Sequence, residues 1–272
     1  MLRHVSMLSR DTPPQIWLIG GTTEGLELAE LIAQQSLRCT VSVTTDVARY
    51  PYPCSPLLQI CIRQFNYTTL TQFLTVQNVA VILDASHPHA AEISTLAIQV
   101  AQDFQIPYLR VERPTITEMA CGVQEVQNVA AVLTPEYLLG QRVLLTLGAK
   151  ALNQFQPWQS RSTLFARILP SETALQAAMA AGFAQKRLIA LRPPISMELE
   201  MALWRQWNVE RVVTKASGQP GGEGVKRQVA EALGIPLVVI QRPQLAYPQQ
   251  TGDLRVAIAF CQQTLQNLSR KG

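Results

Sequence analysis

A short apolar run, a glycine-rich turn and a helical pattern, in that order, constrain the fold of this chain most strongly. Residues 16–19 read IWLI, residues 20–25 read GGTTEG, and apolar positions recur at helical spacing from Leu26 to Ile32. A second apolar run, residues 39–44, follows at the distance expected of one strand–helix–strand unit. The helical crossover of such a βαβ unit requires its two strands to be parallel. The chain is therefore predicted to be an α/β protein.

Further apolar runs continue this pattern. Strands are predicted at residues 79–83 and 106–111, with a helix over residues 90–104 between them, and a last helix is predicted over residues 254–268. The short apolar signature starts again at five other positions, with helical patterns between them: Val143, Leu164, Leu188, Val212 and Leu237. Because nearly unbroken apolar strands alternate with helices, we expect mainly parallel sheets that helices flank on both faces.

A weak internal repeat suggests two halves of similar plan. Residues 81–114 and 212–243 each contain a strand, a polar residue followed by Ala-Ser, a helix, Ile-Pro, a strand and Arg-Pro. The polar residue is Asp84 in the first segment and Lys215 in the second. The alternative is that strand–helix–strand units look alike in any α/β protein.

Thr134-Pro135 and Gly140 punctuate the chain between these halves. We therefore predict a flexible N-terminal tail over residues 1–14, an N-terminal nucleotide-binding α/β domain over residues 15–138 and a C-terminal α/β domain over residues 139–272.

The composition excludes several classes of protein. Hydrophobic residues make up 47% of the 272 residues and charged residues 15%, with a formal net charge of +4. These values are typical of a globular protein, not of a disordered chain or a charge-driven nucleic-acid binder. The sequence predicts no membrane span, because no apolar run approaches about 18 residues. Residues 1–14 also lack the apolar core of a signal peptide.

Cysteine and histidine give no metal site. The five cysteines include no C-x-x-C pair, and a chain of this length needs no disulfides for stability, so reduced thiols are expected. The three histidines, His4, His87 and His89, form no Cys/His cluster with zinc-ligand spacing. We expect no metal and a cytoplasmic location.

The GGTTEG turn lies where a phosphate-binding turn belongs. Gly20 and Gly21 let a ligand approach the backbone, the hydroxyls of Thr22 and Thr23 are available, and the helix that follows directs its free N–H groups toward an anion. The motif is neither G-x-G-x-x-G nor a P-loop, and a tight turn without a ligand is the alternative.

The residues after the second predicted strand bear on the choice of cofactor. Thr44 and Arg49 would favour the 2′-phosphate of NADP, whereas Asp46 would favour the ribose hydroxyl of NAD. The residues alone leave this choice open.

Two further segments end predicted strands, at the edge where open α/β sheets bind ligands. In residues 84–89, Ser86 and the main chain could contact a ligand, whereas Asp84 could simply cap the next helix and His87 could be a turn residue. In residues 214–218, Lys215 would place its ammonium at the sheet edge, beside a glycine-rich stretch.

Cations are frequent at or just beyond the predicted strand ends. Arginine outnumbers lysine by 18 to 5, and arginine suits bidentate contact with carboxylates and phosphates. The cations at these positions are Arg110, Arg113, Lys150, Arg167 and Arg192. Their shared placement indicates a polyanionic ligand, although drift in composition would also raise the arginine count.

Together these segments resemble one known family. The matching segments are GGTTEG (20–25), LDASHPHA (83–90), YLRVERP (108–114), LLTLGAK (144–150), RILP (167–170), VVTKASG (212–218) and GIPLVVIQRP (234–243). In this order they resemble the precorrin-6A reductases, including the form that acts on cobalt-precorrin-6A. The resemblance extends from Ile16 to Pro243.

The resemblance implies NADPH-dependent reduction of one double bond of precorrin-6A, or of cobalt-precorrin-6A, to precorrin-6B in cobalamin biosynthesis. It implies two Rossmann-like domains with the NADPH cofactor and the tetrapyrrole in a ligand cleft between them. Other enzymes of corrin synthesis are candidate partners, whereas nucleic acid and membranes are not. The alternatives are a non-catalytic nucleotide- or tetrapyrrole-binding protein and a nicotinamide-dependent reductase of another substrate.

Site residues follow by position. The expected cofactor-binding residues are Gly20, Gly21, Thr22, Thr23, Glu24, Thr44, Arg49, Asp84 and Ser86. The expected substrate-binding residues are Arg113, Lys150, Arg167, Ser217 and Gly218. Lys215 and His87 are the expected catalytic residues, and the proton donor is Lys215, His87 or water. The sequence departs from the family pattern at His89, where an aromatic residue is usual, and at Ala149, where an arginine is frequent.

Overall fold

The computed structural model describes residues 13–116 and 122–270. The chain divides into two compact units. The first unit comprises Met1–Pro114 and Gln244–Gly272, and the second comprises Thr115–Pro243. The predicted tail falls mostly outside the described residues.

The first unit contains a six-stranded sheet with the order β12-β5-β4-β1-β2-β3, and every neighbouring pair is parallel. Its strands are β1 (Gln15–Ile19), β2 (Cys39–Val43), β3 (Leu58–Ile62), β4 (Val79–Asp84), β5 (Tyr108–Val111) and β12 (Gln250–Thr251). The chain starts in the middle at β1, runs outward to β3, and returns to β4 on the other side of β1. The carboxyl ends of β1 and β4 therefore form the switch point where open α/β sheets bind ligands.

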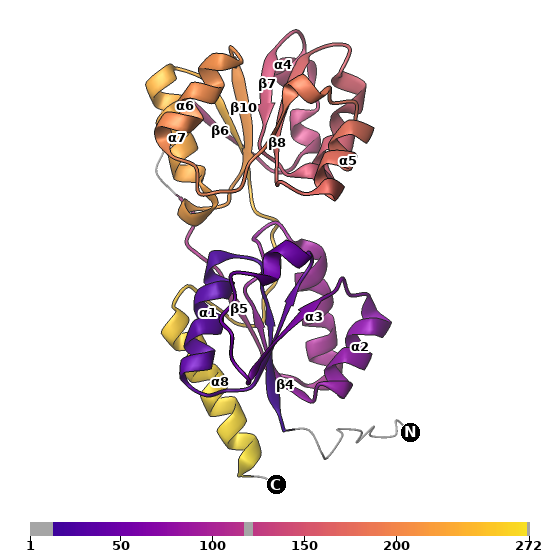
Figure 1. Ribbon diagram of the computed structural model, residues 1–272, viewed down its shortest axis with the longest axis vertical. Helices are drawn as coiled ribbons and strands as arrows, with labels where there is room; N and C mark the ends of the chain where they lie inside the picture. The colour runs from indigo at the N-terminus through magenta and orange to yellow at the C-terminus, as the bar shows by residue number, and fades with distance from the viewer. Residues whose placement is uncertain (1–12, 117–121, 271–272) are drawn as a thin grey trace. The chain divides into compact units, whose positions relative to one another are not determined.

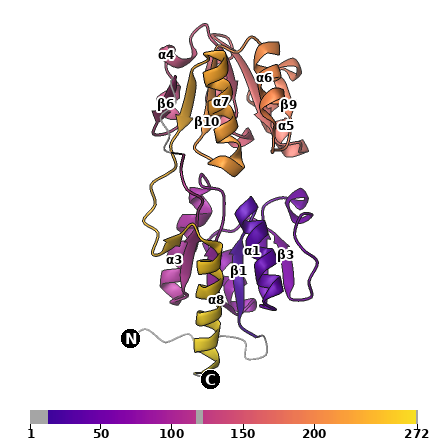
Figure 2. The same cartoon turned by 90° about the vertical axis from the view of Figure 1, so that its left-hand side faces the viewer.

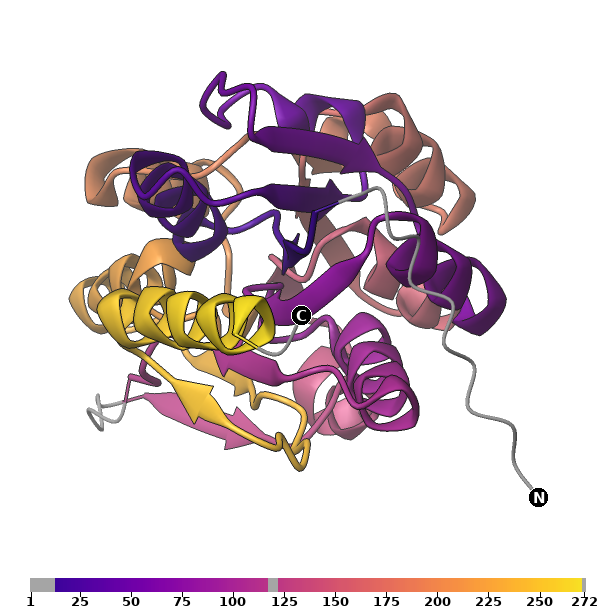
Figure 3. The ribbon, with the colours of Figure 1, turned by 90° about the horizontal axis from the view of Figure 1, so that it is seen from below.

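Helices cover both faces of this sheet (Figure 1). The helices are α1 (Thr23–Gln34) and α8 (Leu254–Ser269) on one face, and α2 (Tyr67–Val76) and α3 (Ala91–Phe104) on the other. Figure 3 shows α8 beside α1. Successive side chains of β1 point to opposite faces of the sheet, so the unit has one apolar core on each face. Ile16 packs with Leu28 on the α1 side, and Trp17 packs with Phe73 on the α2 side.

The second unit repeats this plan with the sheet order β6-β11-β10-β7-β8-β9, again parallel throughout. Its strands are β6 (Val123–Val126), β7 (Arg142–Leu145), β8 (Thr163–Ile168), β9 (Leu188–Ala190), β10 (Arg211–Lys215) and β11 (Leu237–Ile240). The switch point lies here between β7 and β10. Strands β4 and β10 hold equivalent places, which agrees with the repeat seen in the sequence.

Helices also cover both faces of the second sheet. The helices α6 (Met197–Gln206) and α7 (Glu223–Leu233) lie side by side on one face (Figure 2). The other face packs against α4 (Pro135–Leu138), α5 (Glu172–Ala180) and the 3-10 helix η3 (Ala149–Trp158). Shorter 3-10 turns are η1 (Asp46–Arg49), η2 (Ala130–Val132), η4 (Gln185–Arg187) and η5 (Gln219–Gly221).

The prediction of two α/β units with parallel, helix-covered sheets is confirmed. The sequence patterns missed β3, β6 and β12, and each of these strands lies at an edge of its sheet. Two of the four residues of β6 are exposed, and β12 has only two residues, so neither carries the apolar run of a buried strand.

The division of the chain differs from the predicted boundary between residues 138 and 139. Strand β6 precedes that boundary but pairs with β11 of the second unit. Strand β12 and helix α8 follow the second unit in sequence but belong to the first, where β12 pairs with β5. The second unit is thus continuous in sequence and begins before residue 139, whereas the first unit is made of two separate stretches, which a single boundary cannot describe.

The place of α8 in the first unit can be tested with two neighbouring substitutions. Ala257 is fully buried, whereas Val256 is 51% exposed. We expect Ala257→Asp to lower the free energy of unfolding by about 3 kcal/mol, because it buries an unpaired charge, and Val256→Asp to change it by less than about 0.5 kcal/mol. Chemical denaturation measures both. Equal effects of the two substitutions would contradict the packing of α8 described above.

Candidate functional site

The GGTTEG turn connects β1 to α1 at the switch point of the first unit. Gly21 has a φ of +99°, a conformation that side-chain-bearing residues rarely adopt. Thr22 is the N-cap of α1, and its hydroxyl accepts a hydrogen bond from the Gly25 N–H at 3.0 Å. The remaining N–H groups of the first helical turn have no acceptor within the helix, and the positive end of the helix dipole lies there. This geometry suits an anion.

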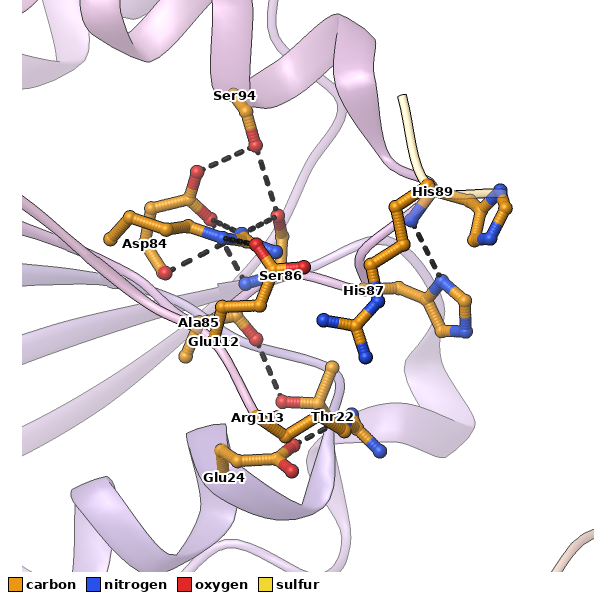
Figure 4. A network of polar contacts seen from close by, with 12 residues as sticks. Thr22, Glu24, Asp84, Ala85, Ser86, His87, His89, Ser94, Glu112 and Arg113 are labelled. Atoms are coloured by element: carbon orange, nitrogen blue, oxygen red, sulfur yellow. Dashed lines mark hydrogen bonds and ion pairs between the residues drawn. The ribbon is translucent and has the colours of Figure 1, made fainter. Parts of the chain in front are cut away.

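The turn is tied to the end of β4. The Thr22 hydroxyl donates a hydrogen bond to the Ala85 carbonyl at 2.7 Å. The two segments predicted from sequence to bind the cofactor, residues 20–24 and residues 84–86, are therefore brought together (Figure 4).

Asp84 is the centre of a buried set of hydrogen bonds (Figure 4). Its side chain is fully buried, and its carboxylate accepts from the Ser94 hydroxyl at 2.6 Å, the Tyr108 hydroxyl at 2.7 Å and Arg110 at 2.8 Å. It also accepts from the backbone N–H of Ser86 at 3.0 Å. Burial and the Asp84 charge raise the pKa of Tyr108, so its phenol keeps the proton that it donates. Asp84 thus fixes the strand end.

Arg110 completes this cluster. Its guanidinium donates to Asp84, to the Ser86 hydroxyl at 2.9 Å and to Glu112 at 3.0 Å, and it lies over the ring of Tyr247. The hydroxyl of Ser86 is consequently held inside the cluster. Sequence reasoning noted Arg110 only as one of several cations near strand ends and assigned no role to Ser94 or Tyr108.

Glu24 and Arg113 form an ion pair at 2.6 Å, and both side chains are largely buried. The sequence predicted Glu24 as a cofactor residue and Arg113 as a substrate residue. The structure places them against each other, joining the first turn of α1 to the segment after β5. The pairing balances the negative charge of Glu24 in the first turn of α1.

His87, Thr44 and Arg49 lie on exposed segments around this edge. The His87 ring accepts a hydrogen bond from the His89 N–H at 3.1 Å. Arg49 pairs with Asp46 at 3.4 Å, and both side chains are more than half exposed. Asp46, which would favour NAD, and Arg49, which would favour NADP, thus form an ion pair with each other.

Tyr52 contacts the glycine turn from another segment of the chain, and the sequence analysis did not identify it. Its phenol oxygen accepts a hydrogen bond from the Gly21 N–H at 2.9 Å. No pattern around Tyr52 signals this contact, because the segment between β2 and β3 is irregular.

Two lysines mark the switch point of the second unit. Lys215 is the last residue of β10, and Lys150 lies at the start of η3, just after β7. Burial and the nearby charge of Lys150 lower the pKa of Lys215. Within residues 13–116 and 122–270, no ion pair includes either lysine. They are the cations best placed in this unit to bind an anionic group.

The loop after β10 is held by the start of α7. The Gly218 N–H donates to the buried carboxylate of Glu223 at 2.8 Å, and the Ser217 hydroxyl donates to the Gly221 carbonyl at 3.1 Å. Arg227 also binds Glu223, at 2.8 Å. Lys226 donates to the Gly222 carbonyl at 2.9 Å, and burial, together with nearby Arg167, lowers the pKa of Lys226 to about 8.

Arg167, like Arg113, is already paired with a carboxylate. Its guanidinium forms an ion pair with the buried Glu200, which also accepts a hydrogen bond from Trp204. A charge already balanced in this way is poorly suited to binding a second carboxylate, so Arg167 and Arg113 fit the role of substrate-binding residues less well than Lys150 does.

The described parts of the chain give two further findings. None of their helices is both long enough and apolar enough to cross a membrane. Nor do they place three or more His, Cys, Asp or Glu side chains together in a group that could hold a metal ion.

A family model and curated relatives that match this chain all describe reductases of precorrin-6 or its cobalt form. A sequence model described as precorrin-6x reductase CbiJ/CobK matches residues 15–262. The chain is 45% identical over 257 residues to a cobalt-precorrin-6A reductase of Synechocystis sp., covering 94% of this chain and 98% of the relative. It is 31% identical over 253 residues to a precorrin-6A reductase of Rhodococcus erythropolis, covering 90% and 96%.

A solved structure agrees on the fold. The structure of a CobK precorrin-6A reductase matches with a TM-score of 0.74 and 24% identity, covering 93% of this chain and 97% of that one. The family match, which extends over nearly the whole chain, shows that the chain belongs to the precorrin-6x reductase CbiJ/CobK family.

Proposed function

We propose that this protein reduces one carbon–carbon double bond of precorrin-6A, or of its cobalt form, to give precorrin-6B in cobalamin biosynthesis, with NADPH as the reductant. The observation that carries the proposal is the glycine turn at the start of α1, joined to the end of β4 at the switch point of a parallel sheet. Membership of the family supplies the reaction class.

The residues of the first unit fit a dinucleotide. The pyrophosphate would bind at the N-terminus of α1, where a Cβ atom built on Gly21 would meet nothing within 4 Å, so a phosphate could approach the backbone there. Glu24 lies in the same helical turn, and its ion pair with Arg113 reduces the repulsion that its carboxylate would otherwise exert on a phosphate. The Asp84 cluster orients the strand end beside the turn and keeps it fixed while ligands exchange.

Our preference for NADPH over NADH is supported by the residues at the end of β2. The exposed Arg49 and the hydroxyl of Thr44 suit a 2′-phosphate, while the one acid of the adjacent η1 turn, Asp46, is engaged by Arg49. An acid available to the ribose hydroxyls would have favoured NADH.

The reaction needs a proton as well as a hydride. The nicotinamide supplies the hydride to one carbon of the double bond, and a proton must reach the other carbon. Lys215 is the proton donor in our proposal, because its lowered pKa brings its proton transfer closer to neutral pH. Lys150 binds a carboxylate of the substrate, and the Ser217–Gly218 segment lies beside Lys215 to contact the macrocycle.

The proposal places the activity in the cytoplasm, where nicotinamide cofactors and reduced thiols are found. Cys39, Cys54, Cys61 and Cys261 are free thiols, as a reducing compartment requires. The predicted ligand cleft between the two domains and the predicted association with other enzymes of corrin synthesis stay predictions.

The direct test is an absorbance assay. Purified protein should consume NADPH only when precorrin-6A or cobalt-precorrin-6A is added, with one NADPH oxidised for each macrocycle reduced. No substrate-dependent loss of the reduced-nicotinamide absorbance with either form would overturn the proposal.

The phosphate turn predicts the effect of charge at Gly21. Gly21→Asp and Gly21→Asn share the strain of a side chain at positive φ, but only aspartate brings a negative charge against the pyrophosphate. We expect Gly21→Asp to weaken NADPH binding about five- to thirtyfold more than Gly21→Asn, since charge effects at helix ends reach about 1–2 kcal/mol. Fluorescence titration with NADPH measures both. Equal affinities would show that the pyrophosphate binds elsewhere.

The proposed contact of Arg49 with the 2′-phosphate can be tested by comparing the Kd of NADPH with that of NADH. Arg49→Ala should raise the Kd of NADPH by about tenfold or more, through loss of a charge-assisted hydrogen bond, and leave the Kd of NADH nearly unchanged. Parallel titrations with the two cofactors make the comparison, and an equal effect on both would remove Arg49 from the 2′-phosphate site.

Substitutions of Lys215 can distinguish proton donation from the binding of a substrate carboxylate. An arginine in its place keeps a positive charge but cannot release a proton, so Lys215→Arg should lower kcat by about 100-fold or more with little change in KM. Lys215→Gln should lower kcat and raise KM. If Lys215→Arg kept its kcat, Lys215 would bind a carboxylate without donating a proton.

The pH profile gives a second check on Lys215. Only the protonated amine can act as an acid, so kcat should fall as pH rises through the lowered pKa of Lys215. Lys150→Gln removes the like charge beside it and should move this fall to higher pH. Steady-state rates across the alkaline range would show the shift, and an unmoved profile would count against this assignment.

A further inference from the structure

The phenol of Tyr52 lies on the glycine turn. Its oxygen is 2.9 Å from the Gly21 nitrogen, from which it accepts a hydrogen bond. A Cβ atom built on Gly20 would lie only 2.3 Å from the same oxygen, and one on Gly25 would lie 3.5 Å away. One polar atom thus lies against the backbone of Gly20 and accepts a hydrogen bond from the Gly21 N–H, whereas a Cβ atom built on Gly21 would meet nothing within 4 Å.

The Gly21 N–H is a donor that an incoming pyrophosphate needs. Glycine at such a turn allows a phosphate oxygen to approach the backbone and accept hydrogen bonds from N–H groups. In this structure the Gly21 N–H already has an acceptor, the neutral Tyr52 oxygen. Burial raises the pKa of Tyr52, so the phenol keeps its proton. It therefore acts at Gly21 as an uncharged stand-in for a phosphate oxygen.

The segment that carries Tyr52 is suited to movement. It is an irregular connection between η1 and the edge strand β3, and among its backbone groups the Leu57 carbonyl, next to β3, accepts from the Cys39 N–H of β2. The Tyr52 N–H donates to the Arg49 carbonyl at 3.2 Å, a contact within the same segment. The ring packs partly against the apolar core of β1, β2 and α1. The phenol could therefore leave the turn without breaking a sheet.

We propose that Tyr52 competes with the pyrophosphate of the nucleotide for the Gly21 N–H, and that it must leave the turn when NADPH binds. The inference rests on the proposed function, because it requires a nucleotide at this turn. It assigns Tyr52 to the cofactor site as a residue that lowers affinity and makes the exchange of cofactor easier.

Removal of the phenol oxygen tests the competition. Tyr52→Phe keeps the ring and its apolar packing but loses the acceptor for Gly21. We expect the Kd of NADPH to fall about three- to tenfold, the range that one neutral hydrogen bond accounts for. Inorganic pyrophosphate should bind more tightly by a similar factor, because the competition concerns the phosphates alone. Fluorescence titration measures NADPH, and calorimetry measures pyrophosphate.

A matched control is Tyr67→Phe in α2. Tyr67 is exposed, and its phenol donates to Asp103 at 2.8 Å. This control should leave both affinities unchanged. Thermal unfolding of each variant confirms that the fold is kept.

The possible outcomes separate the two proposals. If wild-type protein binds NADPH and Tyr52→Phe binds it equally or more weakly, the inference is overturned while the proposed function stands. Weaker binding by the variant would mean that the phenol donates to the nucleotide instead of competing with it. If wild-type protein binds no NADPH at all, the proposed function fails and the inference fails with it.

Discussion

The ion pair between Asp84 and Arg110 is the interaction on which the arrangement at the carboxyl end of β4 depends. Both side chains are fully buried, and a buried charge is tolerated only when it is paired with an opposite charge and hydrogen-bonded. Asp84 has four donors around it, and Arg110 also contacts Ser86 and Glu112. The strand end therefore has one stable arrangement. The Thr22 hydroxyl then fixes the glycine turn to the Ala85 carbonyl of this rigid edge.

The same place in the second unit is built differently. Strands β4 and β10 are topologically equivalent, and they end in Asp84 and Lys215. The acid is buried and fully bonded, whereas the lysine is only partly buried and has a second cation, Lys150, as its neighbour. A fixed acid organises a binding turn, while a lysine beside a like charge is suited to an anionic ligand or to proton transfer. The two units thus share a fold but not a chemistry.

Much of the fold could be predicted from the sequence, because central parallel strands are continuous apolar runs. Edge strands such as β6 and β12 lack that pattern, so the sequence could not indicate the division of the chain. The candidate site could be predicted where neighbouring residues in the sequence form it, as Gly21 and Thr22 do in the glycine turn. Tyr52 was not, since its contact with Gly21 joins residues 31 positions apart and depends on how an irregular segment packs.

The arginine excess also has a structural explanation that the sequence analysis did not offer. Arg110, Arg113 and Arg167 each form an ion pair with a carboxylate of the same unit. Their planar guanidinium groups satisfy several acceptors at once, which suits them to buried ion pairs. Positions that seemed to indicate a polyanionic ligand therefore serve the protein's own acids. Because the described ion pairs leave out Lys150, Arg192 and Lys215, the interpretation of a polyanionic ligand now depends on these three cations.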